Sequence, residues 1–387
     1  MNSRERVQRI LHHQEADRVP IDCIGILCSI YEATYNGILQ YLGLDMEAKE
    51  DAVAKTTASG EFWSVVSKPS EAVLERFGVD FRKVWLGEPA NFEPIVDEEK
   101  GTLVDEWGLT WEKVGLYNEM VKPPMPAPTL EKVKKYPFPD PADPGRYEGL
   151  EEWAKQLYHE TDYCVVAGHS QPGVFELGCF VCGYDVFMTK MVLDKRLVRA
   201  FFERVLEYQI ETFGRYLDLV GPYVQIVETA DDLAGQLAPL ISPSMYRELV
   251  KPYHQEYVGF IKSKAPHAKV FMHTDGSVFD LIPELIEVGI DILNPAQPKP
   301  KKMEPWRLKK EYGKDIVFHG GIDVQGTLQS LDPKGVKRYV KETIRQLAPG
   351  GGYILASSHN IQPDIPPANA VAMYEAAQEY GKYPIIY

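Results

Sequence analysis

Short apolar runs alternate with amphipathic stretches along most of the chain, and after residue 145 the alternation becomes regular. Each run of three to six mainly apolar residues is typical of a buried strand, and the stretches between them have the 3.6-residue period of a helix. The predicted strands are 21–25, 163–168, 223–228, 269–273, 292–294, 316–319 and 353–356. The predicted helices are 3–13, 70–78, 146–160, 184–193, 195–220, 243–264, 277–288, 303–312, 333–347 and 367–381.

Strands that alternate with helices of 10–20 residues predict a parallel sheet. Six predicted strands after residue 145, with one more near residue 20, approach the eight strands of a (β/α)8 TIM barrel. We therefore expect an α/β fold in which residues 1–387 form one barrel domain. Ser3 is the expected cap of the first helix.

The segment 26–145 does not follow this rhythm, and we interpret it as insertions near the start of the barrel. It contains a hairpin-like pattern in which 95–97 pairs with 107–111 across a turn at 98–101. Eight of the 29 prolines lie between residues 122 and 144, which predicts a connection over the surface.

Polar side chains gather directly after the predicted strands, whereas the helix-to-strand turns carry ordinary turn residues such as Gly221 and Pro222. In a barrel, the residues after the strands meet at one rim and build the active site. The residues there that can bind a metal, transfer a proton or contact a substrate are His169, Glu228, Asp232, His273, Asp275, Asn294, His319, Asp323, His359 and Asn360.

His273 and His359 are the most informative of these residues, because each follows an apolar strand. They are 86 positions apart in sequence, yet a barrel can bring them within a few ångströms of each other. Zinc binds neutral imidazole nitrogen and carboxylate oxygen, and a catalytic site keeps one position open. The pattern predicts a metal site with Glu228 or Asp275 as the third ligand.

Structural roles are the alternative for each of these residues taken alone. A histidine at a strand end often only forms a hydrogen bond, which applies to His169 and His319. Asp231 and Asp232 are also typical helix caps. Asp275 followed by glycine is typical of a simple turn.

Composition limits the classes of partner. The formal net charge is −14 and the pI is near 5.2, which argues against nucleic acid and against a polybasic membrane contact. The first residues form no apolar signal core, and no apolar run is long enough to span a bilayer. Five cysteines in a chain of this size fit the reducing cytoplasm. Cys179-x-x-Cys182 has no second pair for a structural zinc site, and we expect two buried residues.

Several short motifs together resemble the uroporphyrinogen decarboxylase superfamily. The matching stretches are 17–20 (DRVP), 240–243 (LISP) with Tyr246 and 251–253 (KPY), 273–276 (HTDG), 320–323 (GGID) and 358–363 (SHNIQP) with 366–367 (PP). They spread over nearly the whole chain. The resemblance implies a TIM barrel with one of two activities. One branch decarboxylates the acetate arms of a tetrapyrrole without a cofactor, and the other contains zinc-dependent methyltransferases that work with corrinoid proteins.

The chain departs from the decarboxylase branch where that branch has an arginine-rich Arg-Gln-Ala-Gly-Arg segment. The corresponding stretch, 25–31, contains no arginine. Because buried carboxylates need cationic partners, this argues against a tetrapyrrole substrate. Thiol-methylating members of the other branch have His-x-Cys and a later Cys, whereas this chain has His273-x-Asp275 and His359. A zinc ion held by these harder nitrogen and oxygen ligands would be a stronger Lewis acid, which favours polarisation of an ether or alcohol oxygen.

We therefore predict a zinc-dependent methyltransferase that demethylates a small O-methyl donor, with a methoxylated aromatic as the expected substrate. The methyl group would pass to a corrinoid held by a separate partner protein, since the chain has no Asp-x-His-x-x-Gly segment of its own. Asp232 or His319 would protonate the leaving oxygen. The expected substrate contacts are His169, Asn294, Asp323 and Asn360.

Two other functions remain open at this point. A cofactor-free decarboxylase on the same barrel would use Asp232, His273 and His359 as acid and base groups. A non-catalytic binding protein would need the rim residues only as caps. A homodimer is compatible with the sequence, which does not fix the oligomeric state.

Overall fold

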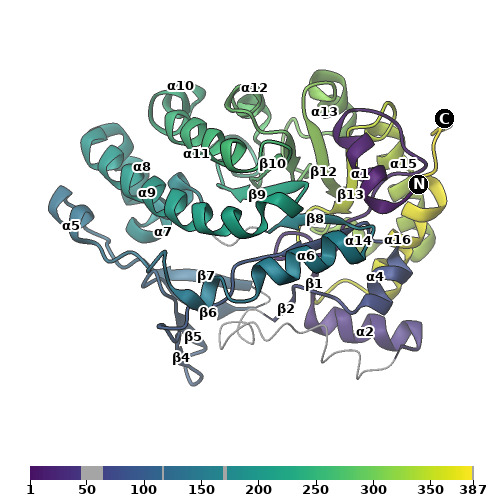
Figure 1. The fold of residues 1–387 in the computed structure, drawn as a ribbon, viewed down its shortest axis with the longest axis horizontal. Coiled ribbons are helices and arrows are strands. Elements are labelled where there is room, and N and C mark those ends of the chain that lie inside the picture. Colours follow the sequence, from purple (N-terminus) through teal and green to yellow (C-terminus); the bar gives the residue numbers. More distant parts are fainter. Residues whose placement is uncertain (45–63, 116, 169–171, 386–387) are drawn as a thin grey trace.

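Seven parallel strands form the centre of the molecule in a computed structural model that describes residues 1–44, 64–115, 117–168 and 172–385 (Figure 1). Along the sheet the order is β13-β12-β11-β10-β9-β8-β3. Neighbours in this order are parallel, as the alternation of strands and helices predicts. The strands are β3 (Phe81–Val84), β8 (Cys164–Ala167), β9 (Ile226–Ala230), β10 (Lys269–His273), β11 (Ile292–Asn294), β12 (Val317–Ile322) and β13 (Tyr353–Ser357).

The segment 20–22 closes the ring between the two edges of this sheet. The amide of Leu355 in β13 donates to the carbonyl of Pro20, and the amide of Asp22 donates back to the carbonyl of Leu355. On the other side, the amide of Asp80, which precedes β3, donates to the carbonyl of Ile21. The predicted strand 21–25 is thus reduced to a short bridging segment, but it supplies the eighth position of the TIM barrel.

β3 lies inside the segment 26–145 that the sequence pattern assigned to insertions. Its sequence, Phe-Arg-Lys-Val, carries two cations in four residues, which conceals a buried strand. The guanidinium of Arg82 bonds Glu71 and lies 3.6 Å from the ring centre of Tyr163. Lys83 points into the barrel, where its side chain is 1% exposed. Tertiary partners therefore make a strand of a segment whose local pattern is polar.

Helices cover the outside of the barrel, and most agree with the predicted stretches. Asn2, and not Ser3, caps the first helix, because its side chain accepts the amide of Glu5. The predicted helix 243–264 is divided by a π-helical turn at Tyr246–Val250. The helices are α1 (Ser3–Leu11), α2 (Glu32–Leu42), α4 (Glu71–Phe77), α5 (Leu130–Lys135), α6 (Leu150–Glu160), α7 (Val174–Cys182), α8 (Tyr184–Leu193), α9 (Lys195–Val220), α10 (Pro243–Met245), α11 (Lys251–Lys264), α12 (Ile282–Val288), α13 (Pro305–Tyr312), α14 (Thr327–Ser330), α15 (Pro333–Leu347) and α16 (Pro367–Tyr380).

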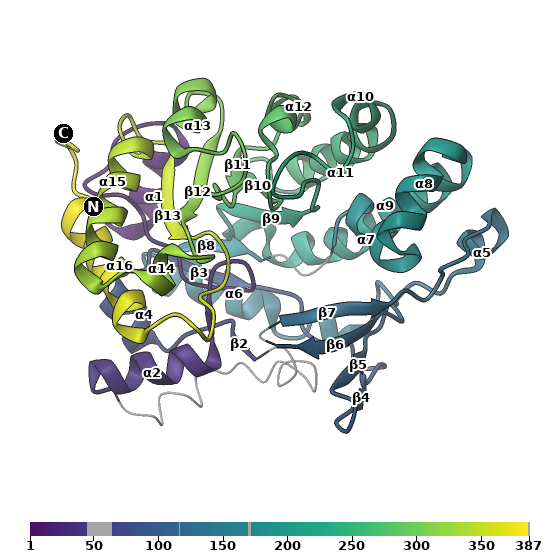
Figure 2. The same cartoon turned by 180° about the vertical axis from the view of Figure 1, so that it is seen from behind.

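A separate antiparallel sheet projects from one side of the barrel, as Figure 2 shows. The predicted turn at 98–101 is present, but 95–97 pairs with 102–104 and not with 107–111. The reason is that Asp105 ties the segment after β5 into a loop by accepting the amides of Trp107 and Leu109. The strands of this sheet are β4 (Ile95–Asp97), β5 (Thr102–Val104), β6 (Thr110–Val114) and β7 (Tyr117–Lys122), and a two-stranded sheet joins β1 (Ile30–Tyr31) to β2 (Val65–Val66).

Candidate functional site

The barrel interior is built in layers, because every second residue of a strand points inward. At the amino-terminal end the inward residues are apolar and pack against α1. This apolar layer contains Phe81, Ile226, Phe271, Ile292, Val317 and Ile354, with Val7 and Ile10 of α1 beneath it. Two residues further along five of these strands, the inward positions are all polar and buried. They are Lys83, Glu228, His273, Asn294 and His319.

Two histidines and one carboxylate meet above this polar layer at the carboxyl-terminal rim. One ligand atom from each of His273, Asp275 and His359 lies within 4.8 Å of the other two. The Nε2 of His273 is 3.8 Å from the Oδ1 of Asp275, too long for a hydrogen bond. The rings of the two histidines are 5.9 Å apart between centroids. The barrel thus brings together residues 86 positions apart.

The environment of these three residues fits a zinc ion. The Oδ1 of Asp275 is buried and has no hydrogen-bond partner among the described residues. Burial lowers the pKa of His359, and His273 lowers it further while Asp275 opposes the shift. The imidazole is therefore neutral at pH 7. Imidazole nitrogen and carboxylate oxygen are donors that catalytic zinc accepts, and such a site uses three protein ligands and keeps a fourth position for water or substrate.

Gly276 holds Asp275 at this position. Its φ is +88°, and a Cβ there would lie 2.6 Å from the carbonyl oxygen of Ala234. Its amide donates to the side chain of Gln297, and the amide of Asp275 donates to Asp232. The turn expected at Asp275 is therefore present, and it directs the carboxylate at the histidines.

Glu228, the other candidate for a third ligand, is bound to a lysine instead. The Nζ of Lys83 lies 2.7 Å from Oε1 of Glu228 and 3.0 Å from Oδ2 of Asp22. Burial alone would lower the pKa of Lys83, but Asp22 and Glu228 outweigh it and raise the pKa well above its ordinary value. Burial would likewise raise the pKa of Asp22, yet Lys83 and His319 hold it well below. Asp22 is thus ionised beside a fixed cation, and Glu228 shares the same ammonium group.

A chain of hydrogen bonds connects this ionic group to the metal-ligating candidate His273. The Nδ1 of His273 lies 2.5 Å from Oδ1 of Asn294, and the Nδ2 of Asn294 lies 2.7 Å from Nδ1 of His319. The Nε2 of His319 is 3.1 Å from Oδ2 of Asp22. Both ring nitrogens of His319 are therefore occupied in the interior. In this arrangement His319 and Asn294 bond other side chains of the barrel interior, and their predicted roles in proton transfer and substrate binding stay predictions.

A second set of ligand atoms, from Asp22, Cys28 and His319, also lies within 4.8 Å. It is fully buried, and the ammonium of Lys83 already supplies the cation beside Asp22. Burial raises the pKa of the Cys28 thiol well above its ordinary value. A protonated thiol is a poor metal ligand. We therefore interpret this cluster as the ionic core of the barrel.

Further carboxylates lie close to the three candidate metal ligands. Burial raises the pKa of Asp232 to about 6, and Asp275 adds to the shift while His273 opposes it. Burial also raises the pKa of Glu176 well above its ordinary value, with further contributions from Asp232, Asp231 and Asp275. Glu176, at the start of α7, was not among the predicted residues, because the sequence pattern missed this helix.

Asp231 caps a helix, which is the structural role that the sequence offered for it as an alternative. Its carboxylate caps α7 by accepting the amides of Phe175 and Glu176. It also bonds Nε2 of His254 at 2.8 Å, and the other ring nitrogen of His254 meets the hydroxyl of Tyr246. The capped helix precedes Asp231 in sequence and is not the next helix along the chain.

The remaining predicted substrate contacts are engaged within the chain. Asp323 is fully buried and accepts the amides of Gln325 and Thr327 at the start of α14. Asn360 accepts the amide of Ser29 and donates to the carbonyl of Ile26, which ties two rim loops together. These bonds use the two side chains as a helix cap and a loop tie, and their roles as substrate ligands stay predictions. His169 lies outside the described residues.

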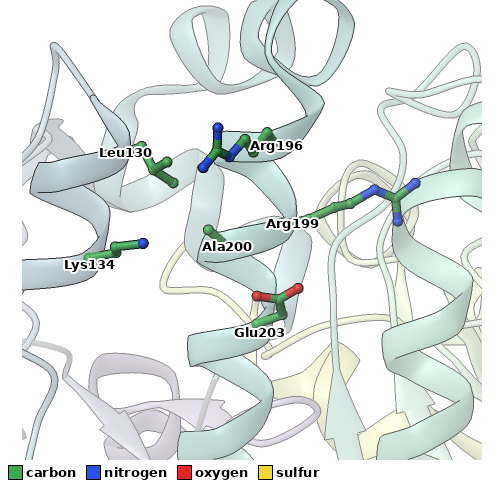
Figure 3. Close-up of a pocket in the computed structure, with 6 residues that line it drawn as sticks. All are labelled: Leu130, Lys134, Arg196, Arg199, Ala200 and Glu203. Carbon is green, nitrogen blue, oxygen red and sulfur yellow. The ribbon is translucent and has the colours of Figure 1, made fainter.

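Other features lie apart from the rim. The five cysteines are buried and unpaired, as expected for Cys179 and Cys182. An open groove of about 430 Å³ between α5 and α9 carries none of the predicted residues (Figure 3). Leu130, Lys134, Arg196, Arg199, Ala200 and Glu203 line it. Within the described ranges, no helix has both the length and the apolar character needed to cross a membrane.

Comparisons with known proteins agree with this fold. The uroporphyrinogen decarboxylase of Aliarcobacter butzleri is 26% identical over 183 residues, covering 47% of this chain and 49% of that protein. The uroporphyrinogen decarboxylase of Hydrogenobaculum sp. is 23% identical over 222 residues, covering 52% and 59%. The chain spans about half the length of the curated relatives that it matches.

A solved methyltransferase from Methanosarcina mazei superposes over 98% of this chain and 99% of its own, with a TM-score of 0.64 and 17% identity. At that identity, the likeness concerns the fold. The family profile described as uroporphyrinogen decarboxylase (URO-D) matches residues 114–380, well over half of the sequence. The chain therefore belongs to the uroporphyrinogen decarboxylase (URO-D) family.

Proposed function

We propose that this protein is a zinc-dependent methyltransferase that removes the methyl group from a small O-methyl donor and passes it to a corrinoid on a partner protein. The observation that carries the proposal is the convergence of His273, Asp275 and His359 at the barrel rim, with a buried carboxylate oxygen that has no hydrogen-bond partner among the described residues. The fold likeness to a methyltransferase is consistent with this assignment.

His273, His359 and Asp275 would hold the zinc ion, leaving one position open to the rim. When bound, the ion would act as a Lewis acid towards an ether oxygen and make it a better leaving group. Among its hydrogen bonds with described residues, Asp232 accepts only that from the amide of Asp275. With a pKa raised to about 6, it is a suitable proton donor to the departing oxygen.

The charges at the rim support a methyl donor that carries no carboxylates. Asp232 and Asp275 lie close enough to raise the pKa of Glu176, and Asp275 also raises the pKa of Asp232. Lys83 is already bound by Asp22 and Glu228 and cannot serve a substrate carboxylate. A methoxylated aromatic without acidic groups fits this environment better than a tetrapyrrole with many acetate arms.

The first test is the zinc content of purified protein, compared with a His273→Ala/His359→Ala variant. We expect about one zinc per chain in the wild type, since three ligands and an open position form one site, and a loss of zinc in the variant. The second step is to mix the zinc-loaded protein with a methoxylated aromatic and a free Co(I) corrinoid, and to follow methyl-Co(III) by absorbance. A wild-type protein that binds no zinc when zinc is offered would refute the proposal.

A cofactor-free decarboxylase is the second candidate, and the names of the curated relatives favour it. Asp232 would then work as an acid beside His273 and His359. This activity would resist a chelator, whereas the methyl transfer proposed above would be lost with the metal. Decarboxylation of a tetrapyrrole by zinc-free protein would decide for this candidate.

A further inference from the structure

Hydrogen bonds lead from His273 through Asn294 and His319 to Asp22 beneath the rim. Asp22, the last member of this chain, determines the direction of donation. Asp22 is ionised, so its carboxylate can only accept hydrogen bonds. It accepts from the amides of Cys23 and Ile24 through Oδ1, and from Lys83 and His319 through Oδ2. The carboxylate is thus fixed from both sides, and the Nε2 of His319 must carry a proton to meet it.

That proton determines which atoms of the next two groups donate and which accept. In a neutral imidazole with a proton on Nε2, Nδ1 is an acceptor. The Nδ1 of His319 therefore faces the NH2 group of Asn294, at 2.7 Å. The other end of the amide, Oδ1, then faces Nδ1 of His273 at 2.5 Å, and it can only accept. His273 must consequently carry its proton on Nδ1.

The consequence for the rim is that the Nε2 of His273 is left with its lone pair. This is the nitrogen that lies 3.8 Å from Oδ1 of Asp275. A metal ion needs an unprotonated nitrogen, and the hydrogen bond made by the other nitrogen decides which one is free. The opposite orientation of Asn294 would require donation from both nitrogens of His319 and would place a proton on Nε2 of His273.

We infer that Asn294 is a positioning residue for the metal site, held by His319 and Asp22, and that it fixes the tautomer and ring orientation of His273. The inference rests on the zinc site of the proposed function, but the tautomer it assigns is a property of the metal-free protein. An amide does not pass on a proton as an imidazole or carboxylate does, so the chain orients His273 and does not conduct protons to it.

The location of the chain agrees with such a role. Asn294 is fully buried, and His319 and Asp22 are each 2% exposed, so water does not compete for these bonds. The members come from three different barrel positions, β10, β11 and β12, with Asp22 in the closing segment. A network that is satisfied at every step specifies one arrangement, because each unpaired polar group would be costly.

The test combines three variants. Asn294→Leu keeps the volume but removes both bonds. Asn294→Asp keeps an acceptor for Nδ1 of His273, and so serves as the conservative rescue. Asn369→Leu is the matched control, since Asn369 is also a buried amide but donates to the carbonyls of Leu328 and Leu331, away from the rim.

Two readouts are measured on these proteins. The first is the zinc dissociation constant, from competition with a chromophoric chelator. We expect Asn294→Leu to bind zinc 10- to 100-fold more weakly, Asn294→Asp to recover most of the affinity, and Asn369→Leu to equal the wild type. The second is the tautomer of His273 in the zinc-free wild type, from ¹⁵N-detected long-range imidazole spectra, which should show the proton on Nδ1.

The outcomes separate this inference from the proposed function. If the wild type binds zinc and Asn294→Leu binds it as tightly, the inference is wrong while the zinc site stands. A proton on Nε2 of His273 in the wild type would overturn it as well, even if no variant folds. If the Nδ1 proton is found but the wild type binds no zinc, the assigned tautomer is supported and the proposed function fails.

Discussion

The ammonium of Lys83 lies 2.7 Å from the carboxylate of Glu228 in the barrel interior. This ion pair distinguishes Glu228 from Asp275, which the sequence alone leaves as equal candidates for the third metal ligand. Glu228 has the ammonium of Lys83 as its partner, whereas Asp275 presents a buried oxygen without a hydrogen-bond partner among the described residues. A metal at the rim would therefore draw on Asp275 and leave Glu228 to the ionic core.

The choice between these two carboxylates can be tested directly. We expect Asp275→Asn to weaken zinc binding at least about tenfold, as the loss of a ligand or of its support does. Glu228→Gln should change the affinity less than about threefold, since its group is engaged by Lys83. Titration of both proteins with zinc in the presence of a competing chelator gives the answer. Equal losses in the two variants would contradict the assignment.

Replacing Lys83 by methionine should destabilise the fold strongly. The change leaves Asp22 and Glu228 buried without their cation, and breaking a buried pair in this way costs about 3–5 kcal/mol. The free energy of unfolding in urea measures the effect. The double variant Lys83→Met/Glu228→Gln is the control, because it removes one stranded charge and should regain part of the loss. No recovery in the double variant would show that packing, and not charge, sets the cost.

Stability should depend on pH through Asp232. Its pKa rises from the ordinary 3.8 to about 6 on folding, so the folded protein binds more protons between these values. The stabilising contribution is complete below about pH 4 and is lost as the pH rises past 6. Asp232→Asn should therefore be more stable than the wild type by about 1–3 kcal/mol at pH 8 and equal to it near pH 4.

Urea unfolding of metal-free protein at both pH values measures this difference. Asp364→Asn, which changes an exposed carboxylate, is the control and should shift stability little at either pH. A gain of Asp232→Asn that is the same at pH 4 and pH 8 would exclude titration of Asp232 as its source.

Gly276→Ala should reduce both stability and zinc affinity. The left-handed backbone and the carbonyl 2.6 Å from a new Cβ predict a cost of about 1–3 kcal/mol. Because Gly276 follows Asp275, the displacement would also move the carboxylate away from His273. Gly259→Ala in α11 is the contrasting control, since its Cβ meets nothing within 4 Å and alanine favours a helix. Thermal unfolding and zinc titration of both variants provide the comparison.

Much of the barrel follows from local pattern. The predicted strands at 269–273 and 292–294 have the observed bounds, because an apolar run between polar turns needs no distant partner to be recognised. The strand with Arg82 and Lys83 was missed for the opposite reason. Its cations are satisfied by Glu71, Asp22 and Glu228, which are distant along the chain.

The sequence by itself determined that histidines and carboxylates follow the strands of a parallel barrel, so that His273, Asp275 and His359 had to lie near one rim. That conclusion needs only hydrophobic period and the common direction of the strands. Which polar residues remain free there was decided by the tertiary structure. Hydrogen bonds and ion pairs act over about 3 Å, and such distances between Lys83 and Glu228, or between Asn294 and His319, exist only after the barrel has closed.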